Sequence, residues 1–470
     1  MVVPLQLETL AFDPADAKVA LSQLPASAAV FALYGAEAHA EPYIGRTPNL
    51  RGRLERLLQP SAKHPRRLQL AGRVRQIRWR LTGSEFEGLL AQFTLLEKVY
   101  GAKSLERMHL GAPAFVRYLG SNAYPRIVVT NRPSQREADW AYGPFQSRAA
   151  AERFADEALK LFLLRRCTEE LEPRPDHPGC VYSEMKMCLA PCYQGCTDER
   201  YAEEAGAVER FMATRGESSL VTLRTQRDEA SAKLEFEAAA ALHTQIQRVE
   251  SVRALAPELV RPMSQLRTVI LQASAVPGEV AVFLYEDGIL RGPHGFSTLG
   301  MRIQNEQSGS TSLFAQPIAV EAIAETAGSR DQGSGISTAE TEPTAGAETH
   351  VVLKGHDFSR AANASKQDGA LAPAGSSSEV TSTPSAKPAR GVLEDRMEAV
   401  LAALVEVEEA PSATVRQGHL ALVKRWYYRP EVRRSGEIFF PGDDGCWPVK
   451  ALLRGVGRVA ASGFKTPTAG

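Results

Sequence analysis

Residues 41–57 read Glu-Pro-Tyr-Ile-Gly-Arg-Thr-Pro-Asn-Leu-Arg-Gly-Arg-Leu-Glu-Arg-Leu. This stretch predicts a short strand at Tyr43, a turn over 45–49 and a helix that carries three arginines. Guanidinium groups bind phosphate oxygens through planar forks, and a phenol beside them can donate or relay a proton. We therefore expect Tyr43, Arg46 and Arg53 to form a phosphate-facing edge. The alternative is a solvated basic helix after an ordinary hairpin.

The charge distribution around this stretch favours a polyanionic partner. The whole chain has a formal net charge of zero, but residues 46–80 hold eleven Lys or Arg against the single acid Glu55. Such a local excess of positive charge is typical of surfaces that bind nucleic acid. A merely solvated face usually mixes both signs of charge.

Length and composition indicate a globular protein of several domains. The 470 residues are 44% hydrophobic and 23% charged, and they contain no run of eighteen apolar residues. The first residues lack a basic region followed by an apolar core, so no signal peptide is expected. We predict a cytoplasmic location and no membrane segment.

The neighbouring residues predict a small α/β domain over 26–106. Residues 28–35 form an apolar run that ends in glycine, as in a buried strand, and residues 74–81 alternate basic with apolar side chains. Ser84 and Glu87 predict a capping box at the start of a helix over 84–100. The expected order is strand, strand, helix, strand, helix.

This order, with Tyr43-Ile44-Gly45 in the second strand, resembles the GIY-YIG nuclease domain. Within that superfamily it is most similar to UvrC, the incision subunit of nucleotide excision repair, and to its short relative Cho. The resemblance implies a three-stranded sheet with flanking helices. It also implies catalytic roles for Tyr43, for Arg46 in place of the usual Lys, and for Arg53, with Mg²⁺ or Mn²⁺ held by a carboxylate on the later helix.

The sequence departs from that pattern at two positions. Phe31 stands where the family has its first-strand Tyr, and Tyr34 is expected on the opposite face of the sheet. Gln92 stands where the family has its metal-binding Glu, and a neutral amide is a poor ligand for a hard divalent cation. Two interpretations therefore stay open: a DNA endonuclease (excinuclease), and a catalytically inactive paralogue that binds DNA or a partner.

Five of the six cysteines lie between residues 167 and 196. In a cytosolic protein such a cluster predicts a metal site rather than disulfides, but the spacing does not choose between an iron-sulfur cluster, zinc and a metal-free patch. The resemblance to UvrC implies a 4Fe-4S cluster on Cys167, Cys180, Cys188 and Cys192, with Cys196 as an extra thiol. A redox sensor on the same scaffold is a further hypothesis that rests on the cysteines alone.

Residues 217–254 predict a helical hairpin. Its Leu-Glu-Phe-Glu-Ala-Ala run at 234–239 resembles the UVR motif, through which UvrC docks on the helicase subunit UvrB. The resemblance implies that a UvrB-type partner contacts Leu234, Phe236, Glu237 and Ala239. Phe236 would anchor a helix-in-groove contact. The alternative is an amphipathic pair of helices that belongs to the core.

The last part of the chain carries weaker signals. Residues 255–303 predict a β-hairpin, and residues 304–391 predict a disordered linker or insertion because they are rich in Ser, Thr, Gly, Ala and Pro. Residues 392–470 predict a helix at 393–407, an aromatic-basic stretch at 424–429 and a Gly-rich basic tail. We expect the aromatic-basic stretch to form a small core with arginines that reach solvent, rather than a stacking surface for single-stranded DNA.

Together these observations predict a multi-domain α/β protein. After an N-terminal segment (1–25) come the nuclease-like domain (26–106), a connecting region with the cysteine cluster (107–197), a helical region with the UVR motif (198–254) and the parts described above. We expect a UvrC-like component of nucleotide excision repair that binds damaged DNA and a UvrB-type helicase subunit. The RNase H-like and helix-hairpin-helix domains of full-length UvrC proteins are expected to be missing.

Overall fold

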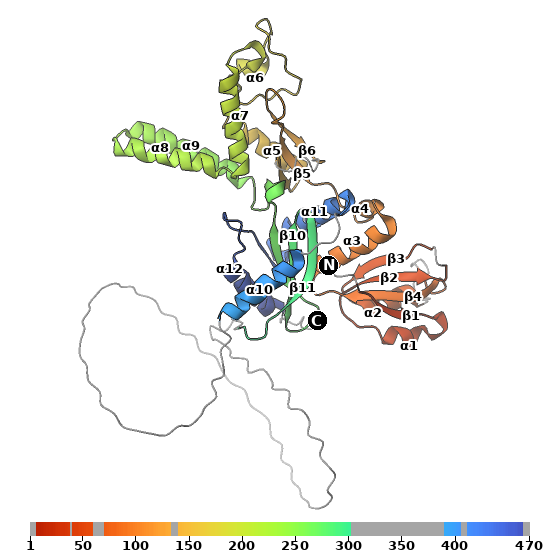
Figure 1. The fold of residues 1–470 in the computed structure, drawn as a ribbon. Coiled ribbons are helices and arrows are strands. Elements are labelled where there is room, and N and C mark those ends of the chain that lie inside the picture. Colours follow the sequence, from red (N-terminus) through yellow and green to blue (C-terminus); the bar gives the residue numbers. More distant parts are fainter. Residues whose placement is uncertain are drawn as a thin grey trace, which may run out of the picture. The chain divides into compact units, whose positions relative to one another are not determined.

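The computed structural model of the protein describes residues 6–37, 40–59, 70–132, 140–301, 390–405 and 411–463. These residues form a mixture of helices and small sheets, so the predicted α/β class is confirmed (Figure 1). Several sequence predictions lie outside the described residues. They are the contributions of Lys63, Arg66 and Arg67 to the basic run, the low-complexity segment over 304–389 and the tail over 464–470.

The first sheet is antiparallel and has four strands in the order β1-β4-β2-β3. Its strands are β1 (Glu8–Ala11), β2 (Ala29–Gly35), β3 (Tyr43–Thr47) and β4 (Val74–Leu81). The sequence predicted three of them and missed β1, which comes from the segment before residue 26. This strand is short and mostly exposed, and it is held by backbone pairing with β4 rather than by an apolar face.

Helices cover both faces of this sheet. The short helices η1 (Pro14–Asp16) and α1 (Ala17–Ser22) precede it, and α2 (Leu50–Leu58) packs with α1 against the face that carries Phe31 and Leu33. Helix α3 (Glu85–Tyr100) lies on the other face, where Ala91 and Leu95 contact Val30. Strand β3 therefore forms one edge of the sheet between two helical layers.

The predicted capping box at α3 forms in a modified version. Ser84 Oγ accepts a hydrogen bond from the backbone N–H of Glu87 at 3.1 Å, as predicted. The carboxylate of Glu87 accepts from the N–H of Gly83 at 2.8 Å, one residue before the cap. Burial raises the pKa of Glu87, while this hydrogen bond and the nearby Arg80 oppose the rise.

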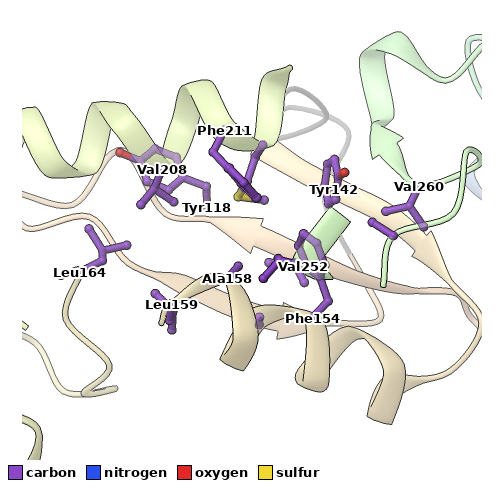
Figure 2. Packing of buried hydrophobic residues seen from close by; sticks show 14 of the residues in the cluster. Tyr118, Tyr142, Phe154, Ala158, Leu159, Leu164, Val208, Phe211, Val252 and Val260 are labelled. Atoms are coloured by element: carbon purple, nitrogen blue, oxygen red, sulfur yellow. The ribbon is translucent and has the colours of Figure 1, made fainter. Parts of the chain in front are cut away.

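The middle part of the chain forms a second sheet, in the order β6-β5-β7-β8. After α4 (Lys103–Arg107) come β5 (Ala114–Tyr118), β6 (Ile127–Thr130), β7 (Ala141–Phe145) and, much later, β8 (Arg261–Pro262). Helices α5 (Arg148–Ala158) and α7 (Asp198–Ala213) share a core with this sheet. Figure 2 shows Phe154 and Ala158 of α5 gathered with Val208 and Phe211 of α7 in this core.

Between these elements lie the cysteine loop and the predicted hairpin. The loop contains α6 (Val181–Glu184) and η3 (Pro191–Tyr193). Helices α8 (Glu217–Ala232) and α9 (Phe236–Ala254) run side by side, as predicted (Figure 1). The hairpin packs only by its base, where Leu220, Ile246 and Val252 join the core of the middle part.

The third sheet joins two segments that the sequence analysis placed in separate regions. Strands β9 (Thr268–Ala273), β10 (Glu279–Glu286) and β11 (Ile289–Ser297) form a meander after η4 (Met263–Gln265), instead of the predicted hairpin. Strand β12 (Glu437–Phe439) pairs with β9 and gives the order β11-β10-β9-β12. The remaining elements are α10 (Arg390–Val405), α11 (Ala413–Tyr427), η5 (Glu431–Arg433) and α12 (Val449–Gly463).

Among the residues that the structure describes, none of the helices combines the length and the apolarity that a membrane span requires.

Candidate nucleic-acid interface

Tyr43 and Arg53 lie next to each other at the edge strand. The turn after β3 ends at Asn49, whose side chain caps α2 by accepting from the N–H of Gly52 at 2.8 Å. This cap fixes the start of α2, and Arg53 Nη2 then lies 3.5 Å from Tyr43 Oη. Both side chains are half-buried. The structure thus brings together a phenol and a guanidinium that the sequence analysis had assigned to one edge.

Phe31 lies beneath these two residues. Its ring is 6.1 Å from the ring of Tyr43, between centroids, and the side chain is only 1% exposed. Gly45 allows this close packing, because a Cβ atom at that position would lie 2.8 Å from Phe31 Cζ. Phe31 therefore fills a core position and brings no hydroxyl group to the edge.

Arg46 and Gln92 lie on the other side of the sheet. Arg46 is three residues from Tyr43 on the strand, so its side chain points to the α3 face. The side chain of Arg46 packs against Gly88 of α3. The contact is close, because a Cβ atom added at Gly88 would lie 2.8 Å from Arg46 Cδ. Gln92 is half-buried one turn after Gly88, on the same stripe of the helix. Tyr43 and Arg53 thus lie on one side of the edge strand, whereas Arg46 and Gln92 belong to the side that α3 covers.

Glu85 is a charged group of this region whose role the sequence analysis did not identify. Its carboxylate binds Arg429 through two hydrogen bonds of 2.6 and 2.8 Å, and Arg46 at 3.2 Å. The hydrogen bonds from Arg429, helped by the charges of both arginines, lower the pKa of Glu85 from 4.5 to about 2, against the effect of burial. Arg46, expected to clamp phosphate, is therefore already paired with an acid.

No three His, Cys, Asp or Glu side chains within the described ranges converge closely enough to bind a metal ion. Gln92 contributes only a neutral amide on its stripe of α3. The Mg²⁺ or Mn²⁺ site that the resemblance implied thus lacks a visible set of carboxylates and stays a prediction.

The arginines of β4 make contacts within the fold. Arg78 stacks on the ring of Tyr34, with its Cζ 4.7 Å from the ring centroid, so Tyr34 faces away from Tyr43 as predicted. Arg80 lies 3.7 Å from the buried carboxylate of Glu87. Part of the positive charge of β4 is thus used inside the domain. Arg51 and Arg56 of α2 also donate, to the carbonyl oxygens of Leu24 and Gly52, but among the described residues they have no acidic partner and are the better candidates for contact with phosphate.

The four predicted cysteine ligands lie in the loop between α5 and α7, but among the described residues no three such side chains are placed as metal ligands. Burial raises the pKa of Cys188, and the charges of Cys180, Cys192 and Cys167 raise it further. Cys196 is also close to Cys192, and its pKa is raised by burial, by Asp198 and by Cys192. Such mutual repulsion between thiolates is what a bound cation would relieve.

Arg165 holds the start of this loop in place. It is 3% exposed, and its guanidinium donates to the carbonyl oxygens of Tyr124 and Glu169 and approaches Cys167 Sγ at 3.5 Å. The 4Fe-4S cluster stays a prediction.

The tip of the α8–α9 hairpin exposes two large apolar side chains. Leu234, in the turn, is 71% exposed and Phe236, at the start of α9, is 66% exposed. Glu237 is exposed and Ala239 is half-exposed beside them. The alternative that these residues belong to the core is thus wrong for the tip, although it holds for the base of the hairpin.

The aromatic-basic stretch at the end of α11 is part of a core. Trp426 is 2% exposed, packs against Phe86 of α3 and donates from Nε1 to the carbonyl oxygen of Ser435 at 3.0 Å. Arg425 and Arg429 extend from this core to the carbonyl oxygen of Met108 and to Glu85. The predicted small core is confirmed, but its arginines bind α3 and the loop after α4 instead of simply reaching solvent.

Comparison with protein families identifies the class of protein. The family described as "UvrC/Cho excinuclease, middle domain" matches residues 115–211, the sheet and helices around the cysteine loop. The family described as "UvrB/uvrC motif" matches residues 217–252, the α8–α9 hairpin. The chain is therefore a UvrC-like protein.

Several curated relatives of this chain are named UvrABC system protein C. The UvrABC system protein C of Ruminiclostridium cellulolyticum is 27% identical over 309 residues, which are 64% of this chain and 49% of that protein. The UvrABC system protein C of Alcanivorax borkumensis is 28% identical over 211 residues, 45% of this chain and 34% of that protein. The chain thus spans half or less of the length of the curated relatives it matches. No solved structure matches it.

Proposed function

We propose that this chain acts in nucleotide excision repair as a UvrC-like component that binds damaged DNA and docks on a UvrB-type partner. The observation that carries the proposal is the exposure of Leu234 and Phe236 at the tip of a hairpin that matches the UvrB/UvrC motif. Large apolar side chains exposed together are typical of protein–protein contact sites.

The hairpin is built to present these side chains. Leu220 and Ile246 anchor its base in the core, and Arg224 ties α8 to α9 through Glu250 at 3.1 Å. The tip therefore needs little ordering when it binds, which favours affinity. We propose that Phe236 enters an apolar groove of the partner's own helical hairpin, with Leu234, Glu237 and Ala239 around it.

A binding measurement tests this docking. Labelled full-length chain is titrated with the isolated UvrB-type subunit, and the Phe236→Ser variant is expected to bind at least about 30-fold more weakly, as for a central anchor of an interface. Val19→Ser is the matched control, because Val19 is 62% exposed on α1, far from the hairpin in sequence. Equal affinity of Phe236→Ser and the wild type would contradict the docking.

We propose that the edge formed by β3 and α2 contacts the DNA backbone. Arg53 is half-buried beside Tyr43, whereas Arg56 is exposed one turn nearer the end of α2. A phosphate contact by Arg53 predicts that Arg53→Ala weakens binding to any DNA sequence and lowers the slope of log affinity against log salt by about 1. An unchanged salt slope would remove Arg53 from the interface.

A second candidate function is incision of the DNA, and the Tyr43–Arg53 pair favours it. In this proposal Tyr43 orients the attacking water, and Arg53 stabilises the charge that develops on the phosphoryl group. A divalent cation would supply Lewis-acid activation of the phosphate. Phe31 and Gln92 favour the opposite interpretation, a paralogue that binds without cutting.

A nicking assay separates these two candidates. The chain and its partner are incubated with damaged duplex in Mg²⁺ or Mn²⁺, and nicking that Arg53→Ala abolishes would support incision. No nicking by the wild type, together with nicking by Gln92→Glu, would identify the missing carboxylate as the defect. If both proteins bind DNA and neither nicks it, the result would contradict incision and support the role in DNA and partner binding.

We propose a 4Fe-4S cluster on Cys167, Cys180, Cys188 and Cys192. The match of the UvrC/Cho middle-domain family to residues 115–211, which include all four cysteines, supports it. Anaerobically purified protein should then be brown, with absorbance near about 400 nm that Cys192→Ser removes. A colourless protein with one bound zinc would refute the cluster and support the alternative.

A further inference from the structure

The base of the α8–α9 hairpin borders a cavity of about 550 Å³ that the functions proposed above do not use. This volume lies within the range of small-ligand pockets, roughly 300–1,000 Å³. Its walls come from the segment after α5 and from α7, α8 and α9.

The cavity is positively charged. Lys160, Arg210 and Arg248 line it, and the lining includes no acidic residue. Lys160 shares its charge with Glu157 at 2.6 Å, on an exposed surface where such a pair is weak. Within the described ranges neither Arg210 nor Arg248 has an ion pair or a hydrogen bond from its guanidinium.

The beginning of α8 adds to the attraction for an anion. Ser218 and Ser219 belong to the first turn of this 16-residue helix and line the cavity. A helix N-terminus carries a partial positive charge. The N–H groups of Glu217 and Ser218 already donate to Thr214, so the hydroxyl groups of Ser218 and Ser219 are the donors offered to phosphate oxygens. Helix dipole, hydroxyl groups and guanidinium groups thus meet at one cavity.

The remaining wall of the cavity is apolar, and this restricts the chemical class of ligand that fits. Leu161, Leu223 and Val249 make this wall apolar, and Phe162 is held in place by an edge contact with Phe211, 5.4 Å between ring centroids. A bare inorganic anion would leave this wall exposed to water. A ligand with phosphate at one end and a flat ring at the other would cover both parts.

We propose that this cavity binds a nucleotide, with its phosphate at Arg210, Arg248 and the start of α8, and its base against Phe162 and the apolar wall. The nucleotide comes either from the free pool or from a DNA strand whose end or unpaired base enters the cavity. Both sources present the same chemistry to the protein. The site is separate from the β3–α2 edge and from the hairpin tip, so its function does not depend on theirs.

Calorimetric titration of the full chain tests the proposal with defined probes. The probes are 2′-deoxyadenosine 5′-monophosphate, 2′-deoxyadenosine, inorganic phosphate and a single-stranded DNA octamer. The monophosphate should bind saturably and more tightly than either the nucleoside or phosphate. Displacement of the monophosphate by the octamer assigns the cavity to a DNA strand, whereas no displacement assigns it to free nucleotides, and both results support a nucleotide site.

Two kinds of variant locate the binding. Arg210→Gln with Arg248→Gln should weaken binding of the monophosphate by at least about 10-fold, because two charge-assisted contacts are lost. Ala207→Phe should also abolish it, because this half-buried position lines the cavity and a larger side chain fills it without changing any charge. Arg153→Gln is the control, since Arg153 is exposed on α5 outside the cavity.

Three results would overturn the proposal. They are no saturable binding of the monophosphate, equal binding by the wild type and the cavity variants, and binding of inorganic phosphate as tight as that of the monophosphate. The last result would show that the apolar wall does not take part. Because Ala207→Phe and the double arginine variant change different properties of the cavity, misfolding of one still leaves the other as a test.

Discussion

The ion pair between Glu85 and Arg429 should stabilise the protein measurably, because it joins α3 to the end of α11. A change of one in pKa corresponds to about 1.4 kcal/mol of free energy. The fall in the pKa of Glu85 from 4.5 to about 2 therefore corresponds to about 3 kcal/mol, of which Arg429 contributes the larger part and Arg46 the smaller. The side chain of Glu85 is 43% exposed, so solvent screening reduces the expected contribution to about 1 kcal/mol.

A double-mutant cycle measures this contribution directly. Urea denaturation of the wild type, Glu85→Gln, Arg429→Gln and the double variant should give a coupling free energy of about 1 kcal/mol at pH 7. Arg148 and Glu152 on α5 provide the matched control, because both are about half exposed at 2.7 Å. Their coupling free energy should not exceed about 0.5 kcal/mol.

The pH dependence of the coupling follows from the lowered pKa of Glu85. The carboxylate is ionised in both the folded and the unfolded chain above pH 4.5, so its contribution is then complete. It declines as the pH falls from 4.5 towards about 2, because only the unfolded chain takes up a proton at first. A coupling of zero at pH 7, or one that grows below pH 4.5, would refute the reasoning.

Removing Glu85 should also change the binding of DNA. Arg46 is 30% exposed and loses its acidic partner at 3.2 Å in Glu85→Gln, so its charge becomes available to phosphate. We expect a severalfold higher affinity for duplex DNA and a steeper dependence on salt. A lower affinity of Glu85→Gln for DNA would show instead that Glu85 matters more for holding Arg46 in position than for neutralising its charge.

Three further predictions concern packing and protonation. Gly45→Ala should lower the free energy of unfolding by about 1–3 kcal/mol in urea denaturation, because its Cβ would lie 2.8 Å from Phe31 Cζ; a neutral effect would contradict this close contact. Gly418→Ala should have an effect of about the same size, since its Cβ would lie 2.1 Å from Phe93 Cζ where α11 crosses α3. Burial, aided by the charge of Arg291, lowers the pKa of His419 to about 4, so stability should fall between pH 6.5 and 4, and an NMR titration midpoint near 6.5 would contradict this.

Local signals in the sequence predicted most of the first domain. The strand at Val74–Leu81 alternates apolar and basic residues, and Ser84 marks the start of α3, so both were found with accurate bounds. Strand β1 was missed because its four residues, Glu-Thr-Leu-Ala, are mostly exposed and carry no alternation to detect. Its formation depends on the unpaired edge of β4, which is a property of the folded sheet.

The candidate site was predictable only where its residues are close in sequence. Tyr43 lies on a strand and Arg53 on the helix that follows it after a short turn capped by Asn49. Their proximity could therefore be predicted from the order of these two elements. Glu85 and Arg429 are 344 positions apart, and no periodicity relates them. The positive charge available to DNA was therefore overestimated, because the acid that neutralises Arg46 could not be located.

The pairing of β12 with β9 changes how the end of the chain must be divided. Val269 and Leu271 of β9 share a core with Leu401 of α10 and Leu452 of α12, so neither segment can bury its apolar face without the other. The low-complexity residues between them thus interrupt one domain rather than link two. Because α11 of this domain also packs on α3 and supplies Arg429 to Glu85, the end of the chain sets the charge at the edge where DNA is proposed to bind.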